Sequence, residues 1–205
     1  MIRATRIAAV LLAAGSSERF GRENKLLAEI GGEPLLRRVA RGTIEAGLSE
    51  IIAVTGHESD RCRSALEGLA VRFVDNADWK QGIGTSIAAG VRALGEEYDG
   101  AFIVPTDMPN LTSALFARLR AEFDASSGSA IVFPVTGDGE QRNPVLWPQA
   151  YFPDLRSLSG ATGAKTLLLR HAAQRHSVPL GSDEEAADID TLADLATVRD
   201  EPRAL

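Results

Sequence analysis

Short apolar runs alternate with longer helix-periodic stretches along residues 7–133, and this alternation constrains the fold more than any other feature. The runs with the length and aliphatic character of buried strands are Ile7–Ala13, Ile51–Thr55, Val71–Val74, Ala101–Val104 and Ala130–Phe133. The helix-periodic stretches between them are Pro34–Ala46, Ser59–Leu66, Ser86–Leu94 and Thr112–Phe123. Alternating strands and helices form right-handed crossovers and a mostly parallel sheet with helices on both faces. We therefore predict a three-layer α/β fold.

The pattern becomes less regular after Phe133. Thr136–Trp147 is rich in turn residues and predicts a hairpin. Further helices are expected over Gln149–Ser157, Gly163–Arg170 and Thr191–Val198. No stretch has the composition of a flexible linker, so we expect residues 1–205 to form one domain, whose part from about residue 134 is a lobe beside the sheet.

Composition and charge exclude several classes of protein. Hydrophobic residues make up 44% and charged residues 24% of the chain, which excludes a disordered protein. The net charge is −6 without a basic stripe, so nucleic acid is not an expected partner. The apolar run from Ile7 to Ala14 is too short to span a bilayer, no signal peptide is evident, and Cys62 is the single cysteine. We expect a cytoplasmic protein without a membrane partner or a disulfide framework.

Ligands of parallel sheets bind beyond the carboxyl ends of the strands, which directs attention to the first loop, Ala14–Lys25. Its small residues leave backbone N–H groups accessible, and Gly15 permits backbone angles that suit a nucleotide-wrapping turn. Arg19 and Lys25 supply two cations for a polyphosphate. The spacing matches neither a Walker loop nor the dinucleotide fingerprint. On spacing alone, a glycine- and serine-rich turn with solvated charges explains this loop equally well.

Carboxylates stand at two places where a metal ion could be held. Asp107 directly follows a buried strand, and a carboxylate there can bind Mg²⁺ together with phosphates and waters, although it could also cap a turn. Asp188 and Asp190 are two residues apart and share one face if the chain is extended. Asp190 and Thr191 could equally form the N-cap of the last helix.

These segments together resemble a known family. The stretch LAAGSSERFGRENKLL, Leu12–Leu27, resembles the nucleotide loop of the MobA-like nucleotidyltransferases, and most closely that of the molybdenum cofactor cytidylyltransferases. Further matching segments are Asn76–Gly90, Val104–Pro109, Arg142–Trp147, Ser159–Lys165 and Asp188–Leu195. The resemblance runs from Ile7 to about Val198 and implies a Rossmann-like nucleotide-diphosphate transferase fold.

The resemblance also implies an activity and a set of site residues. It implies Mg²⁺-dependent transfer of CMP from CTP to the phosphate of molybdopterin, or of the molybdenum cofactor, with release of pyrophosphate. A molybdoenzyme or its chaperone would be a further partner. Arg19, Lys25 and Asp107 are the implied catalytic residues, and Asp107 and Asp190 the implied metal ligands, with Asp188 in support. The implied nucleotide contacts are Leu12, Ala13, Ala14, Gly15, Arg19, Lys25, Thr55, Gly56, Asn76, Gly82 and Ser86.

Several positions depart from the family pattern or have a second interpretation. Thr106 precedes the metal-binding aspartate where glycine, alanine or cysteine is common. Asn143 replaces a histidine, Ala161 an acid and Lys165 an arginine, all in segments that the family uses for its second substrate. Ser86 and the neighbouring threonine could be plain helix caps, and the tryptophan of Asn76–Gly90 a lid or a packing anchor. GTP in place of CTP, another phosphate acceptor, a non-catalytic nucleotide- or cofactor-binding module and a glycosyltransferase remain alternatives.

Overall fold

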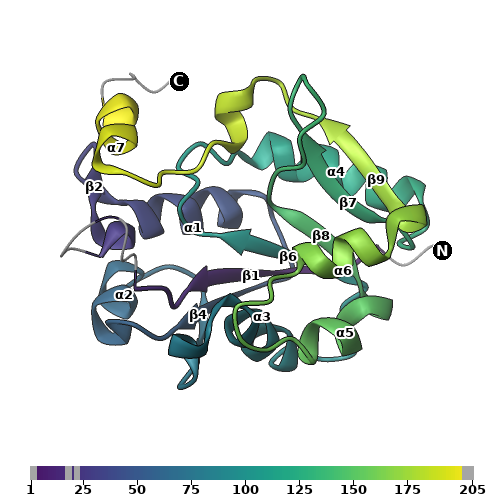
Figure 1. Ribbon diagram of the computed structural model, residues 1–205, viewed down its shortest axis with the longest axis horizontal. Helices are drawn as coiled ribbons and strands as arrows, with labels where there is room; N and C mark the ends of the chain where they lie inside the picture. Colours follow the sequence, from purple (N-terminus) through teal and green to yellow (C-terminus); the bar gives the residue numbers. More distant parts are fainter. Residues whose placement is uncertain (1–3, 17–19, 21–23, 200–205) are drawn as a thin grey trace.

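A seven-stranded sheet forms the centre of the computed structural model, which describes residues 4–16, 20 and 24–199 (Figure 1). Its strands, in chain order, are β1 (Ile7–Ala13), β4 (Glu50–Thr55), β5 (Arg72–Asp75), β6 (Gly100–Pro105), β7 (Ile131–Val135), β8 (Val145–Pro148) and β9 (Arg175–Pro179). The spatial order is β5-β4-β1-β6-β8-β7-β9. β8 runs antiparallel to both β6 and β7, and the other pairs are parallel.

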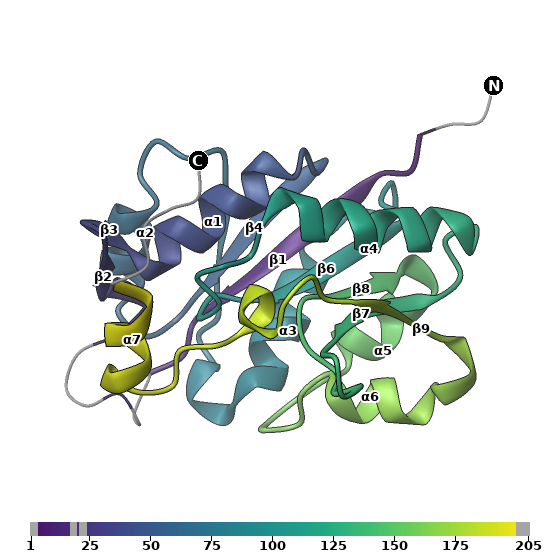
Figure 2. The same ribbon diagram turned by 90° about the horizontal axis from the view of Figure 1, so that it is seen from above.

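Helices cover both faces of this sheet (Figure 2). One face carries α1 (Leu35–Glu45), α2 (Ser59–Ala65), α4 (Ser113–Ala125) and α7 (Leu192–Arg199). The other face carries α3 (Ile83–Arg92), α5 (Phe152–Arg156) and α6 (Lys165–Arg170). A short hairpin of β2 (Glu29–Ile30) and β3 (Glu33–Pro34) precedes α1. The predicted three-layer α/β fold with a mostly parallel sheet is confirmed.

The side chains of β1 explain why one continuous apolar run serves two cores. Ala9 and Leu11 pack into the core beneath α1 and α4, whereas Ala8 and Val10 pack into the core beneath α3. Successive residues of a strand point to opposite faces, so every position of β1 has to be apolar. The close approach of α3 depends on Gly90, where an added Cβ would lie 2.2 Å from the Val10 side chain.

The predicted elements differ from the observed ones mainly at their ends. α3 begins at Ile83 rather than near Ser86, because Gly82, at φ +123°, allows the chain to enter the helix earlier. The expected helix Gln149–Ser157 begins as a 3-10 turn and becomes α-helical at Phe152. The β2–β3 hairpin and β9 were not predicted.

β1 lies between β4 and β6. The chain continues from β1 to β4 and β5 on one side of β1 and then crosses to β6 on its other side. Such a switch point opens a crevice at the carboxyl ends of the strands, where ligands of α/β proteins bind. Among the residues that the structure describes, no helix has both the length and the apolarity that a membrane crossing requires.

Candidate active site

A cleft of about 660 Å³ opens at the carboxyl ends of β1 and β6. It brings together residues from widely separated parts of the sequence. The predicted site residues in its wall are Leu12, Ala14, Gly15, Lys25, Gly82, Ser86, Asp107 and Asp190. The crevice expected from the topology is therefore a real cavity, and it contains the two carboxylates that the sequence suggested for a metal ion.

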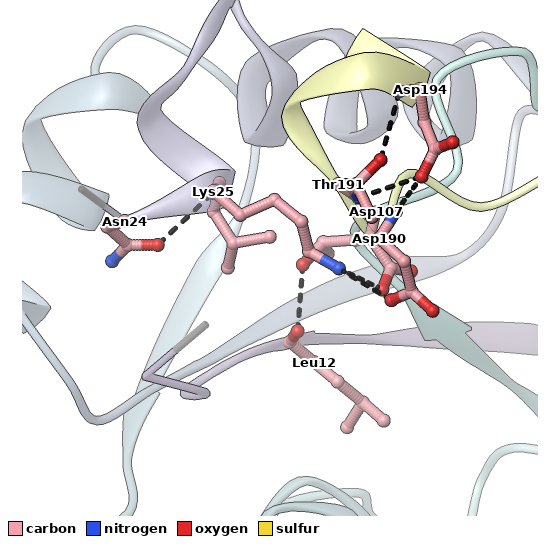
Figure 3. A network of polar contacts seen from close by, with 9 residues as sticks. Leu12, Asn24, Lys25, Asp107, Asp190, Thr191 and Asp194 are labelled. Atoms are coloured by element: carbon pink, nitrogen blue, oxygen red, sulfur yellow. Dashed lines mark hydrogen bonds and ion pairs between the residues drawn. The ribbon is translucent and has the colours of Figure 1, made fainter. Parts of the chain in front are cut away.

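Lys25 reaches both of these carboxylates (Figure 3). Its Nζ donates a hydrogen bond to Asp107 Oδ2 at 2.9 Å and lies 3.6 Å from Asp190 Oδ1. The Lys25 side chain is 11% exposed, so solvent screens these contacts less than it screens surface ion pairs. The preceding Asn24 fixes the start of the 3-10 helix Lys25–Leu27, since its Oδ1 accepts a hydrogen bond from Leu26 N at 3.1 Å. The ammonium group is thereby held between two negative charges.

The backbone around Asp107 is held by neighbours on two sides. The hydroxyl of Thr106, which is buried, donates to the Leu12 carbonyl at 2.8 Å and so links the ends of β6 and β1. The N–H of Ile189 donates to the Asp107 carbonyl at 2.9 Å. This second bond brings the segment that carries Asp190 beside Asp107, across more than eighty residues of chain.

Thr191 and Asp194 cap the start of α7. The Thr191 hydroxyl accepts a hydrogen bond from Asp194 N at 3.2 Å, and Asp194 Oδ2 accepts from Thr191 N at 2.7 Å and Asp190 N at 3.0 Å. This reciprocal pair is a capping box, and its hydrogen bonds lower the pKa of Asp194, foremost the one from Thr191 N. The Asp190 side chain lines the cleft and faces Lys25.

The two carboxylates fit a hard divalent cation that keeps other ligands. Asp107 and Asp190 each present an oxygen within 4 Å of the same ammonium nitrogen, so the site already accommodates a positive charge between them. Within the described part of the chain, no group of three or more His, Cys, Asp or Glu side chains could hold a metal ion. Mg²⁺ commonly takes one or two protein carboxylates and completes its shell with phosphates and waters.

The first turn of α3 forms another wall of the cleft. Thr85 and Ser86 lie inside this helix, so they are not its N-caps; the cap residue is Gly82. Asn76 is buried and does not line the cleft. Its Nδ2 instead donates hydrogen bonds to Thr85 Oγ1 at 2.8 Å and to Ser86 Oγ at 3.0 Å. Asn76 thus holds α3 from behind.

Other predicted nucleotide contacts also support the cleft from outside it. Thr55 is fully buried, and its hydroxyl donates to Asp75 Oδ1 at 2.6 Å. Gly56 packs directly against the Trp79 side chain, where an added Cβ would lie only 2.7 Å from it. Ala13 is buried behind the cleft wall. Trp79 itself lines the cleft, with its ring centroid 5.1 Å from that of His57.

Two further predicted residues are placed differently or not described. Arg19 lies outside the described residues. Asp188 lines a neighbouring cavity rather than the cleft of Asp107 and Asp190. Its position two residues from Asp190 in an extended segment did not put both side chains into one cavity.

The neighbouring cavity has a volume of about 400 Å³ and adjoins the cleft. Leu12, Ile83, Pro105 and Asp107 line both. Arg142, Asn143 and Lys165, from the segments that the sequence suggested for a second substrate, line this second cavity. Its floor includes fully buried Trp147, whose indole N–H has no hydrogen-bond partner among the residues that the structure describes.

Sequence reasoning missed several residues in the cleft wall: Ser16, Phe20, Leu26, Lys80, Ile83 and Pro105. Most of them are apolar, and their side chains carry no motif that distinguishes a ligand contact from a core contact. Pro105 lies within Val104–Pro109, and Ile83 stands between Gly82 and Gly84 in Asn76–Gly90. Their positions inside recognised motifs were the available signal.

The MobA-like NTP transferase domain model matches residues 9–176 of the chain. A probable molybdenum cofactor guanylyltransferase of Haloferax mediterranei is 31% identical over 121 residues, which cover 59% of this chain and 57% of that protein. Nicotine blue oxidoreductase of Paenarthrobacter nicotinovorans is 24% identical over 190 residues, covering 91% and 93%. The chain spans 31%, 28% and 25% of the length of three bifunctional curated relatives.

Solved structures share the whole architecture. The Rv0371c homologue from Mycobacterium sp. strain JC1 superposes with a TM-score of 0.81 at 25% identity, covering 94% of this chain and 96% of that one. Rv0371c of Mycobacterium tuberculosis in complex with manganese has a TM-score of 0.78 at 20% identity, covering 97% and 100%. A structure with this fold has therefore been solved with manganese.

Proposed function

The chain belongs to the MobA-like NTP transferase family, and we propose that it transfers CMP from CTP to the phosphate of molybdopterin or of the molybdenum cofactor. One observation carries the proposal. Lys25 Nζ lies within 4 Å of both Asp107 and Asp190, in a cleft that begins at the small-residue turn after β1. A nucleoside triphosphate needs a cation for its phosphates and carboxylates for its divalent ion, and a turn of small residues allows backbone N–H groups to approach the phosphates.

The proposed reaction is a substitution at the α-phosphorus of CTP. An oxygen of the acceptor phosphate forms a bond to that phosphorus, while the bond to the oxygen bridging the α- and β-phosphates breaks and pyrophosphate leaves. A phosphomonoester has a second pKa of about 6, so the attacking group is largely ionised at neutral pH. The chain therefore needs no general base, and catalysis consists of positioning and charge stabilisation.

The residues of the cleft have distinct roles in this proposal. Asp107 and Asp190 would hold Mg²⁺, which when bound offsets the negative charge of the phosphates. Lys25 exchanges its contacts with these carboxylates for contacts with the leaving pyrophosphate, and the resemblance assigns Arg19 to the same task. Ala14 and Gly15 present backbone N–H groups to the nucleotide, and the first turn of α3 supplies the opposite wall.

The second cavity suits the acceptor. It meets the cleft at Asp107, so a phosphate held at its inner end would stand beside the α-phosphorus. Apolar side chains from three strands and two helices line its interior. Lys165 supplies a cation for an anionic group, while Arg142 is paired with Glu140 and Asp188 adds a further carboxylate. A ring system that carries an anionic phosphate matches this combination, and molybdopterin is such a compound.

The test is a panel of triphosphates with purified molybdopterin and Mg²⁺, scored by pyrophosphate release and by the mass of the product. CTP is expected to give the cytidylylated product faster than GTP, ATP or UTP. Pyrophosphate release with GTP and not with CTP would keep the chemistry and change the nucleotide, as in the guanylyltransferase of Haloferax mediterranei. Tight binding of Mg-CTP without pyrophosphate from any acceptor would favour a non-catalytic module.

A further inference from the structure

The junction between the two cavities is largely apolar. Among the residues lining both cavities, Leu12, Ile83 and Pro105 are apolar, and Asp107 carries the charge. If the cleft holds the nucleotide and the second cavity the acceptor, the reacting atoms meet within this ring. Leu12, Ile83 and Pro105 are hereafter called the collar.

Ile83 is the exposed member of the collar. Its side chain is 47% exposed, and among the described residues the other large hydrophobic side chain of this kind is Leu169, at 61%. Leu169 lines neither cavity, whereas Ile83 lines both. An aliphatic side chain that faces solvent at the meeting point of two cavities gains burial only when ligands fill them.

The backbone beneath Ile83 is held firmly. Gly84 N donates to the Gly160 carbonyl at 3.0 Å, which joins the first turn of α3 to the loop that borders the second cavity. A Cβ at Gly82 would lie 2.5 Å from the Gly160 carbonyl oxygen, so helix and loop touch through their backbones. An added Cβ at Gly163 would meet the Ile83 side chain at 3.5 Å. The backbone on either side of Ile83 is thus held against the loop around Gly160, and Gly163 packs close to the Ile83 side chain.

We propose that Ile83, with Leu12 and Pro105, keeps water away from the α-phosphorus and so makes the acceptor, rather than water, the nucleophile. This inference rests on the proposed function. A transferase needs such a device, because water is abundant and competes with the bound acceptor for the activated nucleotide. Exclusion of water from a closed site is a recognised means of preventing hydrolysis.

The competing reaction is fully defined. A water oxygen forms a bond to the α-phosphorus, the bond to the oxygen bridging the α- and β-phosphates breaks, and CMP, pyrophosphate and protons are released. In water enriched in ¹⁸O, the CMP formed in this way carries one solvent oxygen in its phosphate. The transferred nucleotide carries none, so the two outcomes separate by mass.

The experiment compares wild type, Ile83→Ser and Ile83→Leu with Mg-CTP in ¹⁸O-water, with and without molybdopterin. Leu169→Ser is the matched control, because it makes the same kind of change at the other exposed aliphatic residue. Ile83→Ser is expected to raise the ratio of labelled CMP to transfer product by about tenfold, a change that one methylene can make in selectivity. Ile83→Leu and Leu169→Ser are expected to keep the wild-type ratio.

An unchanged ratio in Ile83→Ser, with transfer intact in wild type, would overturn the inference and leave the proposed function standing. An equal rise in Leu169→Ser would overturn it as well. If Ile83→Ser does not fold, Ile83→Ala carries the same expectation. Absence of transfer by wild type with any triphosphate would overturn the proposed function, and the role of Ile83 with it.

Discussion

Lys25 places one ammonium group between two carboxylates, and at the residue scale this contact determines the charge of the cleft. Without the ammonium, Asp107 and Asp190 would face each other with like charge in a partly buried wall. The same nitrogen is placed to meet the phosphates of a nucleotide bound beside those carboxylates. Lys25 therefore neutralises the two carboxylates when no nucleotide is bound and contacts the phosphates during transfer.

Lys25→Met is expected to lower the rate of transfer by about 10²–10³-fold, the usual cost of removing one preorganised charge-stabilising group. The measurement is pyrophosphate release with Mg-CTP and molybdopterin. Arg41→Met is the control, because it removes a cation that pairs with Glu33 and does not line the cleft. Nearly full turnover by Lys25→Met would exclude the role assigned to this residue.

Thr106 is expected to position the cleft through the Leu12 carbonyl. Thr106→Val keeps the shape of the side chain and loses the donor, so the free energy of unfolding should fall by about 1 kcal/mol. Thr43 makes a comparable buried bond to the Val39 carbonyl at 2.9 Å, far from the cleft, and Thr43→Val should cost about as much stability. Only Thr106→Val should also lower kcat, and Thr106→Ser should restore it. Equal kcat in both valine variants would make Thr106 merely structural.

At the scale of elements, the ends of β4 and β5 and the start of α2 are joined by Asp75. Its carboxylate accepts hydrogen bonds from Thr55, Arg63 and Ser59. These bonds, first the one from Thr55, lower the pKa of Asp75 from 3.8 to about 2. A carboxyl whose folded pKa is depressed stabilises the fold above its unfolded pKa and loses that contribution as the pH falls.

The free energy of unfolding is therefore expected to contain a contribution from Asp75 that is present above about pH 4 and lost between about pH 4 and pH 2. Asp75→Asn removes the titrating group and should flatten this part of the profile. Denaturant titrations at a series of pH values measure the effect. Parallel profiles for the two proteins would show that the carboxylate contributes nothing to stability.

Elements differ in how far the sequence could predict them. β1 is predicted to the residue, because a strand buried on both faces is an uninterrupted apolar run. β9 has the sequence Arg-His-Ser-Val-Pro and lies at the sheet edge largely exposed, so neither apolarity nor alternation marks it. Whether Asp190 or Thr191 caps α7 was left open by the sequence, although the spacing of Thr191 and Asp194 is that of a capping box. The collar depends on tertiary contacts that no local pattern encodes.

At the scale of the whole molecule, each cavity contains one of the two tryptophans of the chain. Trp79 lines the cleft and Trp147 the second cavity. Trp147→Phe leaves Trp79 as the fluorophore, and its emission should change when Mg-CTP is added. Trp79→Phe leaves Trp147, whose emission should respond chiefly to molybdopterin. A response of the two single-tryptophan proteins in the opposite order would reverse the assignment of the cavities.

The magnesium site is tested by the binding of Mn²⁺ in the presence of CTP. Binding is followed by electron paramagnetic resonance in wild type, Asp107→Asn, Asp190→Asn and Asp188→Asn. Wild type is expected to bind one Mn²⁺ ion tightly. Asp107→Asn and Asp190→Asn should each weaken the binding of this ion by at least about tenfold, because even the loss of a group that only contacts a metal ligand costs that much affinity. Asp188→Asn should leave the affinity unchanged. Wild-type affinity in Asp190→Asn, or a second ion released independently of the first, would contradict this assignment of the site.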